Sequence, residues 1–165
     1  MFDIKTGVIG VGSMGQNHAR IYSEISDLVY VSDLDESQGI KVAEKLGTKY
    51  VTDYAKMLEH VDAVSIAVPT NLHKDVAERV AASGVHMLVE KPLAPNSSDA
   101  TKIVKVAEDA KVILSVGHIE RHNPSVKFLK SGMLNKRWGK VITISSKRVS
   151  KFLLKSKYQY YDFCL

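Results

Sequence analysis

The sequence has very little cysteine and no long apolar run. Its 165 residues include one cysteine, Cys164, so no internal disulfide can form and a cross-linked secreted scaffold is excluded. No apolar run approaches the ~20 residues of a membrane helix. The opening Met1–Lys5 runs directly into a strand pattern without the features of a signal peptide. We therefore expect a cytoplasmic protein that makes no contact with a membrane.

Signatures of metal and nucleic-acid binding are also scarce. We expect no metal site, on the interpretation that the six histidines form neither a His-x-x-x-His spacing nor a mixed spacing with cysteine. The net charge of +5 is uneven, because residues 127–165 hold ten Lys or Arg and one acid, Asp162. A basic end can bind nucleic acid, but no helix-turn-helix, zinc or RRM signature accompanies it. A solvated, lysine-rich end is the preferred interpretation, and nucleic acid is not an expected partner.

Short apolar runs alternate with longer segments of helical periodicity through the first 117 residues. Helices are expected at about residues 14–26, 37–46, 54–59, 72–82 and 97–110. The expected strands are Ile4–Ile9, Leu28–Ser32, Lys49–Val51, Ala63–Val68, His86–Val89 and Val112–Val116. Such alternation is typical of parallel strands joined by right-handed crossovers. The sequence thus predicts an α/β fold, a doubly wound parallel Rossmann sheet with strand order 3-2-1-4-5-6.

A glycine-rich turn follows the first expected strand and opens the first expected helix. It reads Gly10-Val11-Gly12-Ser13-Met14-Gly15. The first glycine permits the sharp turn, the second lets a pyrophosphate approach the backbone, and the third allows close packing of helix and strand. Free N–H groups and the positive end of the helix dipole then face the phosphates. Within a strand–helix–strand unit this pattern predicts a dinucleotide site.

Asp33 ends the second expected strand, where a carboxylate can accept hydrogen bonds from the hydroxyls of the adenosine ribose. A 2′-phosphate would meet this negative charge, and no Arg follows in residues 34–36, so NAD is favoured over NADP. The alternative is that Asp33 only caps the next turn, although Asp35 is better placed for that task.

In such a sheet, ligands bind beyond the carboxyl ends of the strands, where the strand order reverses. The loop after the fourth strand should therefore face the glycine turn, and the fifth strand should end nearer the nicotinamide. Candidate contacts in these two loops are Val68, Pro69, Thr70, Asn71, His73, Glu90 and Lys91. For His73, a structural place at the start of a helix is equally open, and His18 is expected to be structural or solvated.

Four motifs together resemble the Gfo/Idh/MocA family, named for glucose–fructose oxidoreductase and inositol dehydrogenase. They are residues 10–15, 68–73, 89–93 and 116–124, the last reading VGHIERHNP. That stretch is most similar to the UDP-N-acetylglucosamine 3-dehydrogenase branch. The resemblance implies an NAD-dependent dehydrogenase that acts on a sugar or sugar nucleotide. It also implies that Lys91 is catalytic, orienting the reacting hydroxyl and helping its proton leave.

The resemblance ends early. Family members continue with a large C-terminal substrate domain, of which only one strand at about 141–147 is recognisable, and its Asp-x-x-x-His motif is missing after residue 125. We expect a Rossmann domain at 1–120, the start of a truncated domain at 121–150, and an atypical basic and aromatic tail at 151–165. A helix is expected from Pro124 to Ser131, ending at Gly132, with a strand at Val141–Ser146.

Two functions remain open from the sequence. The first is the cofactor-binding portion of an oxidoreductase, and the second is a non-catalytic dinucleotide-binding module left by truncation. Apolar side chains in residues 141–153 need cover, so a homo-oligomer is expected.

Overall fold

A computed structural model describes residues 3–145 of the chain. Strands and helices alternate along it nearly as expected. The strands are β1 (Lys5–Ile9), β2 (Asp27–Ser32), β3 (Lys49–Val51), β4 (Ala63–Ile66), β5 (His86–Val89) and β6 (Leu114–Val116). The α-helices are α1 (Ser13–Ile25), α2 (Glu36–Leu46), α3 (His73–Ala82), α4 (Ser97–Asp109) and α5 (Pro124–Leu134). Short 3-10 helices lie at Tyr54–His60, Thr70–Leu72 and Ile119–His122.

The strands form one parallel sheet in the order β3-β2-β1-β4-β5-β6. This is the predicted doubly wound order, so the fold class is confirmed. The strand order reverses at the border between β1 and β4. The chain runs outward from β1 through β2 to β3, and then returns to place β4 on the other side of β1. Such a reversal opens a crevice beyond the carboxyl ends of the strands.

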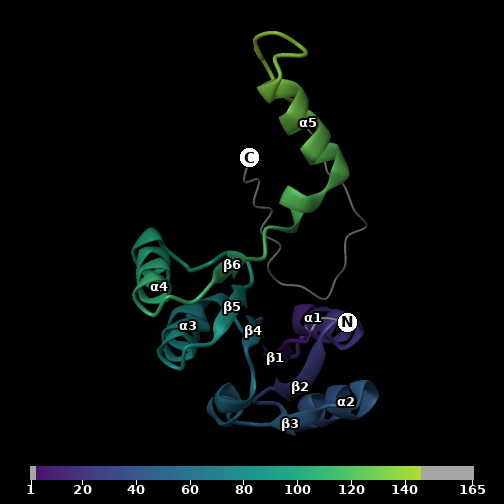
Figure 1. Cartoon of the computed structure of the whole chain (residues 1–165), viewed down its shortest axis with the longest axis vertical. Coiled ribbons are helices and arrows are strands. Elements are labelled where there is room, and N and C mark those ends of the chain that lie inside the picture. The colour runs from purple at the N-terminus through teal and green to yellow at the C-terminus, as the bar shows by residue number, and fades with distance from the viewer. Residues whose placement is uncertain (1–2, 146–165) are drawn as a thin grey trace. The chain divides into compact units, whose positions relative to one another are not determined.

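Helices cover both faces of the sheet (Figure 1). Helices α1 and α2 pack on one face over Val8 and Val31. Helices α3 and α4 pack on the other face over Ile66 and Val89. Strands that are buried on both faces carry continuous apolar runs, and these runs are the pattern from which the sequence predicts the strands.

Local signals place the helix ends. The side chain of Asn96 accepts a hydrogen bond from Asp99 N and caps α4 as expected, while Asp35 accepts from Gln38 N and caps α2. Helix α2 ends at Gly47, whose φ of 67° is the left-handed conformation that glycine adopts at little cost. These boundaries follow from short-range chemistry alone.

The fourth strand is shorter than expected. It ends at Ile66 rather than Val68. Pro69 has no N–H to donate to a neighbouring strand, so the chain leaves the sheet before it. The residues from Val68 onward are therefore free to form a loop at the sheet edge.

The chain divides into two compact units, Met1–Gly117 and His118–Leu165. In the second unit the expectation that the helix ends at Gly132 is wrong, because α5 continues to Leu134. Gly132 is buried, and a Cβ on it would collide with the Trp138 ring, so its small size serves packing rather than termination.

The strand expected at Val141–Ser146 is also wrong where the structure describes it, since residues 141–145 form no regular element. A strand needs a neighbour to satisfy its backbone N–H and C=O groups. Alternation of apolar and polar residues alone therefore does not produce a strand at residues 141–145. Ser146 and the tail at 151–165 lie outside the described residues. None of the helices within residues 3–145 is long and apolar enough to cross a membrane.

Candidate functional site

The carboxyl ends of four strands meet along one edge of the sheet. The residue that follows each of β1, β4, β5 and β6 still donates its N–H to the last residue of a neighbouring strand. These bonds are 2.7–2.9 Å long: Gly10 to Ser32, Ala67 to Ile9, Glu90 to Ile66, and Gly117 to Val89. The loops beyond them therefore start side by side, which brings the starts of all four sequence motifs to one edge of the sheet.

The glycine turn has the geometry that its pattern predicts. Gly10 has φ 85°, a conformation that favours glycine. A Cβ on Gly15 would collide with the carbonyl oxygen of Gly10, so only glycine lets α1 start this close to the strand. Gly12 differs from both, because no atom lies within 4 Å of the position where its Cβ would be.

The first turn of α1 faces open space. Gly12 is the N-cap and has no side chain to bond the first N–H groups, while Ser13 and Met14 are exposed. A helix start with free N–H groups and no cap is a favourable place for a phosphate, because the helix dipole is positive there. The cradle beside Gly12 thus fits the pyrophosphate of a dinucleotide.

Asp33 is tied to this turn. Its Oδ2 accepts a hydrogen bond from Val11 N at 2.7 Å, and its Oδ1 accepts from Asp35 N at 2.9 Å. The second bond is the turn contact that the alternative interpretation expected, whereas the first links the carboxylate to the glycine turn. A carboxylate offers about four acceptor sites, so two remain for ribose hydroxyls.

A cleft that the sequence analysis missed lies next to Asp33. It has a volume of about 400 Å³ and is lined by Leu34, Val51, Thr52, Asp53, Tyr54 and Lys56. These residues lie at or just beyond the carboxyl ends of β2 and β3. That position is the sequence signal that could have identified them as part of a ligand site. Its largely apolar wall suits a flat aromatic base beside the Asp33 carboxylate.

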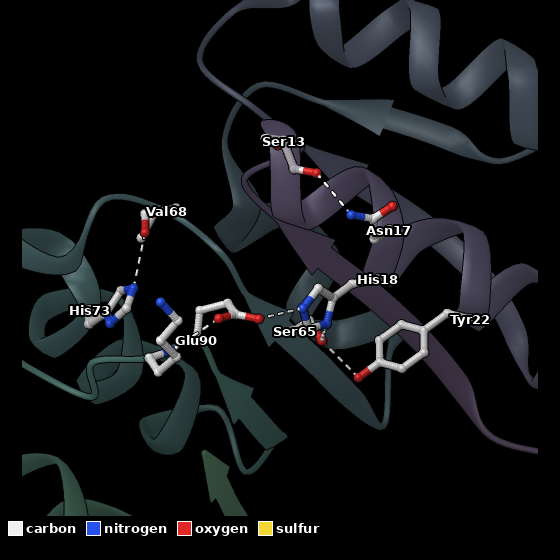
Figure 2. Close-up of polar contacts among 9 residues, drawn as sticks. Ser13, Asn17, His18, Tyr22, Ser65, Val68, His73 and Glu90 are labelled. Atoms are coloured by element: carbon white, nitrogen blue, oxygen red, sulfur yellow. Dashed lines mark hydrogen bonds and ion pairs between the residues drawn. The ribbon is translucent and has the colours of Figure 1, made fainter. Parts of the chain in front are cut away.

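The loop after β4 presents some of the expected residues and hides one. Asn71 and Pro69 are exposed, and Val68 and Thr70 are partly so. His73, in contrast, is 1% exposed. Its Nδ1 lies 3.1 Å from Pro92 O and its Nε2 lies 3.0 Å from Val68 O (Figure 2). The ring thus links this loop to the loop after β5 and leaves no nitrogen free for a ligand. This geometry fits the second interpretation of His73, a structural residue at the start of a helix.

The loop after β5 pairs a buried acid with an exposed lysine. Glu90 is 7% exposed, while Lys91 is exposed and its peptide bond to Pro92 is cis. The carboxylate Oε2 of Glu90 accepts from Lys91 N at 3.1 Å, and Oε1 lies 2.8 Å from Nε2 of His18. The hydrogen bond from His18 is the largest of the effects that hold the pKa of Glu90 below its ordinary value, although burial opposes it.

His18 is a site residue that the sequence did not single out. It is on α1, one turn after the glycine motif, yet it lies against Ser65 of β4 and against Glu90, which follows β5 (Figure 2). Its position three residues after Gly15 was the only available signal, and nothing local indicates that it faces another strand.

The expectation that the histidines form no His-x-x-x-His spacing is wrong, because His118 and His122 are four residues apart. On an α-helix such a spacing can serve a metal. The two histidines border and end a 3-10 helix instead. Among residues 3–145, no three His, Cys, Asp or Glu side chains gather as a metal site would require.

Known proteins share this arrangement. The model of the GFO_IDH_MocA oxidoreductase family, described as having an NAD-binding Rossmann fold, matches residues 4–118. The UDP-N-acetylglucosamine 3-dehydrogenase of Acidithiobacillus ferrooxidans is 38% identical over 130 residues, which are 79% of this chain and 42% of that protein. The myo-inositol 2-dehydrogenase of Thermotoga maritima is 33% identical over 87% of this chain and 45% of that one.

Solved structures agree. The structure of the Acidithiobacillus ferrooxidans dehydrogenase matches with a TM-score of 0.78 and 37% identity, covering 80% of this chain and 44% of that one. A myo-inositol 2-dehydrogenase from Lactobacillus plantarum has the same TM-score at 27% identity, and 44% of its chain is covered. The chain thus spans less than half the length of these relatives.

The open space at Gly12 and the crowding at Gly15 predict opposite effects of two substitutions. Gly12→Val should change the free energy of unfolding by only about 1 kcal/mol, yet abolish NADH binding because the side chain occupies the phosphate cradle. Gly15→Ala should destabilise the fold by about 3 kcal/mol or more through overpacking. Urea unfolding and NADH fluorescence titration measure both. Equal destabilisation by the two changes would contradict the assignment of the cradle.

The lowered pKa of Glu90 predicts an acid-sensitive contribution to stability. A carboxyl whose pKa is lower in the folded protein stabilises it fully above its ordinary value of 4.5, and this contribution disappears as pH falls through the lowered pKa. The free energy of unfolding of Glu90→Gln should therefore decline less steeply in acid than that of the unchanged chain. Urea titrations between about pH 6 and about pH 3 test this. Parallel curves for the two proteins would rule the contribution out.

Proposed function

The chain belongs to the Gfo/Idh/MocA oxidoreductase family, and we propose that it is the cofactor-binding portion of an enzyme that transfers hydride between NAD and a hydroxyl of a sugar or sugar nucleotide. The observation that carries this proposal is the meeting of the glycine turn and the Glu90–Lys91 loop at one sheet edge. The substrate class is supported by the relatives, a UDP-N-acetylglucosamine 3-dehydrogenase and a myo-inositol 2-dehydrogenase.

We assign the cofactor contacts along this edge. The N–H groups of Gly12, Ser13 and Met14 hold the pyrophosphate, and Asp33 accepts from the adenosine ribose. The cleft beside Leu34 takes the adenine ring. Residues of the loop after β4, Val68, Pro69, Thr70 and Asn71, line the path toward the nicotinamide. NAD supplies the hydride acceptor when bound.

Lys91 is the residue that we assign to the chemistry. It is exposed at the end of β5, one strand beyond the switch point. A cation there stabilises the charge that develops on the substrate oxygen, and its Nζ can hold or pass on the hydroxyl proton. Buried Glu90 keeps the backbone of Lys91 in place through the bond to its N–H.

Self-association and a cytoplasmic setting belong to the same proposal. In the second unit, Phe128, Leu134 and Ile142 are 57%, 72% and 92% exposed, and apolar side chains of this kind favour burial between copies. The single cysteine suits a reducing compartment. The domain limits that we propose are 1–120 for the Rossmann domain and 121–150 for the start of a second domain, close to the division of the described chain after Gly117.

A non-catalytic dinucleotide-binding module is the second candidate. It is supported by the location of the cofactor contacts, since all the residues that we assign to NAD lie within the first unit, Met1–Gly117. Both candidates bind NAD, and only the first transfers hydride.

Cofactor choice tests the role of Asp33. The chain should bind NADH more tightly than NADPH by roughly tenfold or more, about 1.4 kcal/mol, because the carboxylate repels a 2′-phosphate. Asp33→Ala should narrow the gap, mainly by weakening NADH binding. Asp35→Ala, which removes a neighbouring carboxylate from the α2 cap, is the matched control and should leave the preference unchanged. Calorimetric titration measures all six affinities, of NADH and NADPH for each of the three proteins. An NADPH preference in the unchanged chain would contradict the assignment.

Turnover decides between the two candidates. If the first candidate is right, NADH should form from NAD in the presence of UDP-N-acetylglucosamine or myo-inositol. Lys91→Ala should reduce the rate by about 10²–10⁴-fold while leaving NADH affinity unchanged. Lys105→Ala, an exposed lysine on α4, is the control. Tight NAD binding with no turnover on any hydroxyl substrate would favour the binding module.

A further inference from the structure

A chain of polar contacts runs beneath the site from α1 to the loop that carries Lys91 (Figure 2). Nε2 of His18 lies 2.8 Å from Oε1 of Glu90, and because an ionised carboxylate only accepts, the histidine is the donor. The side chains are 14% and 9% exposed, so water competes little for this contact. The two residues are 72 positions apart in the sequence.

The other ring nitrogen is held as well. Nδ1 of His18 lies 3.0 Å from Oγ of Ser65, whose hydroxyl donates to the hydroxyl of Tyr22 at 2.8 Å. Burial raises the pKa of Tyr22, so its hydroxyl stays neutral. The imidazole thus has a partner on each side and cannot rotate without losing one of them.

The carboxylate of Glu90 is confined on its far side. Oε2 accepts from Lys91 N at 3.1 Å. A Cβ on Gly117 would lie 3.1 Å from Oε1, so the glycine at the end of β6 leaves just enough room for the acid. Through these two bonds, the Glu90 carboxylate connects the His18 ring to the backbone of Lys91.

Helix α1 begins at the glycine turn, and His18 is one turn into it. Any shift of the pyrophosphate-binding turn moves His18, and through Glu90 it moves Lys91. We propose that His18 and Glu90 are positioning residues that fix the Lys91 loop relative to the cofactor-binding helix. This inference rests on the proposed function, because it takes Lys91 to work beside the nicotinamide.

The electrostatics support an ionised Glu90. The hydrogen bond from His18, together with the bond from Lys91 N and the positive charge of Lys91, lowers its pKa against the opposing effect of burial. An uncharged amide in its place would accept more weakly, since hydrogen bonds to ionised groups are roughly twice as strong as neutral ones. Glu90→Gln therefore weakens the link with little change in side-chain volume.

The test measures how far NADH protects the amine of Lys91. Trace acetic anhydride acetylates lysines according to their accessibility, and peptide mass spectrometry reports each lysine, with exposed Lys105 as the internal reference. In the unchanged chain, saturating NADH should slow acetylation of Lys91 while the acetylation of Lys105 stays the same. Glu90→Gln and His18→Ala should lose most of this protection while binding NADH through an intact glycine turn.

Two variants separate positioning from general stability. Glu24→Gln breaks the exposed ion pair with Arg20 on the same helix, 2.7 Å long, and should keep full protection. His18→Gln retains an amide donor toward Glu90 and should restore part of the protection that His18→Ala loses. A purely structural histidine would give no such rescue at equal NADH affinity.

The outcomes are distinct. Absence of protection in the unchanged chain, with NADH bound, would overturn the role of Lys91 and this inference with it. Full protection in both Glu90→Gln and His18→Ala would overturn the inference alone. If Glu90→Gln does not fold, Gly117→Ala replaces it, because its methyl group displaces the carboxylate by a few tenths of an ångström. It should reduce protection, and unchanged protection there would contradict the link.

Discussion

The approach of α1 to the end of β1 is the constraint from which the rest of the site follows. Gly15 packs where any Cβ would strike the carbonyl of Gly10, so the helix starts directly over the strand end. Ala19, one turn later, is fully buried on the same side. The adjacent His18 is thereby carried over β4, within reach of Ser65. One close contact between backbones thus sets both the phosphate cradle and the polar link beneath it.

Two carboxylates at this edge do different work because their surroundings differ. Asp33 is partly exposed and uses two of its acceptor sites on backbone N–H groups, so it can still bind hydroxyls of a ligand. Glu90 is buried, and both of its oxygens are occupied within the protein. An exposed acid with spare acceptor sites suits recognition, whereas an enclosed one suits positioning.

Much of the fold could be predicted because its signals are local. The apolar runs of a doubly covered sheet, the caps at Asp35 and Asn96, and the glycine turn each depend on a few neighbouring residues. The predictions failed where the structure depended on contacts with residues outside the local pattern. Gly132 was expected to end a helix but instead makes room for Trp138, and the alternation at 141–145 has no strand beside it in the part of the chain that the structure describes.

The sequence by itself determined the class of fold, the order of the strands and the loops from which a dinucleotide site is built, since turn chemistry and hydrophobic period act over short distances. Only the tertiary structure decided what the histidines do. His73 is enclosed by carbonyls of two loops, and His18 meets an acid 72 residues away. Such partners are chosen by how a helix rotates and seats on the sheet. The close packing of many side chains determines how each helix is placed on the sheet, and the spacing of residues along the sequence does not reveal that placement.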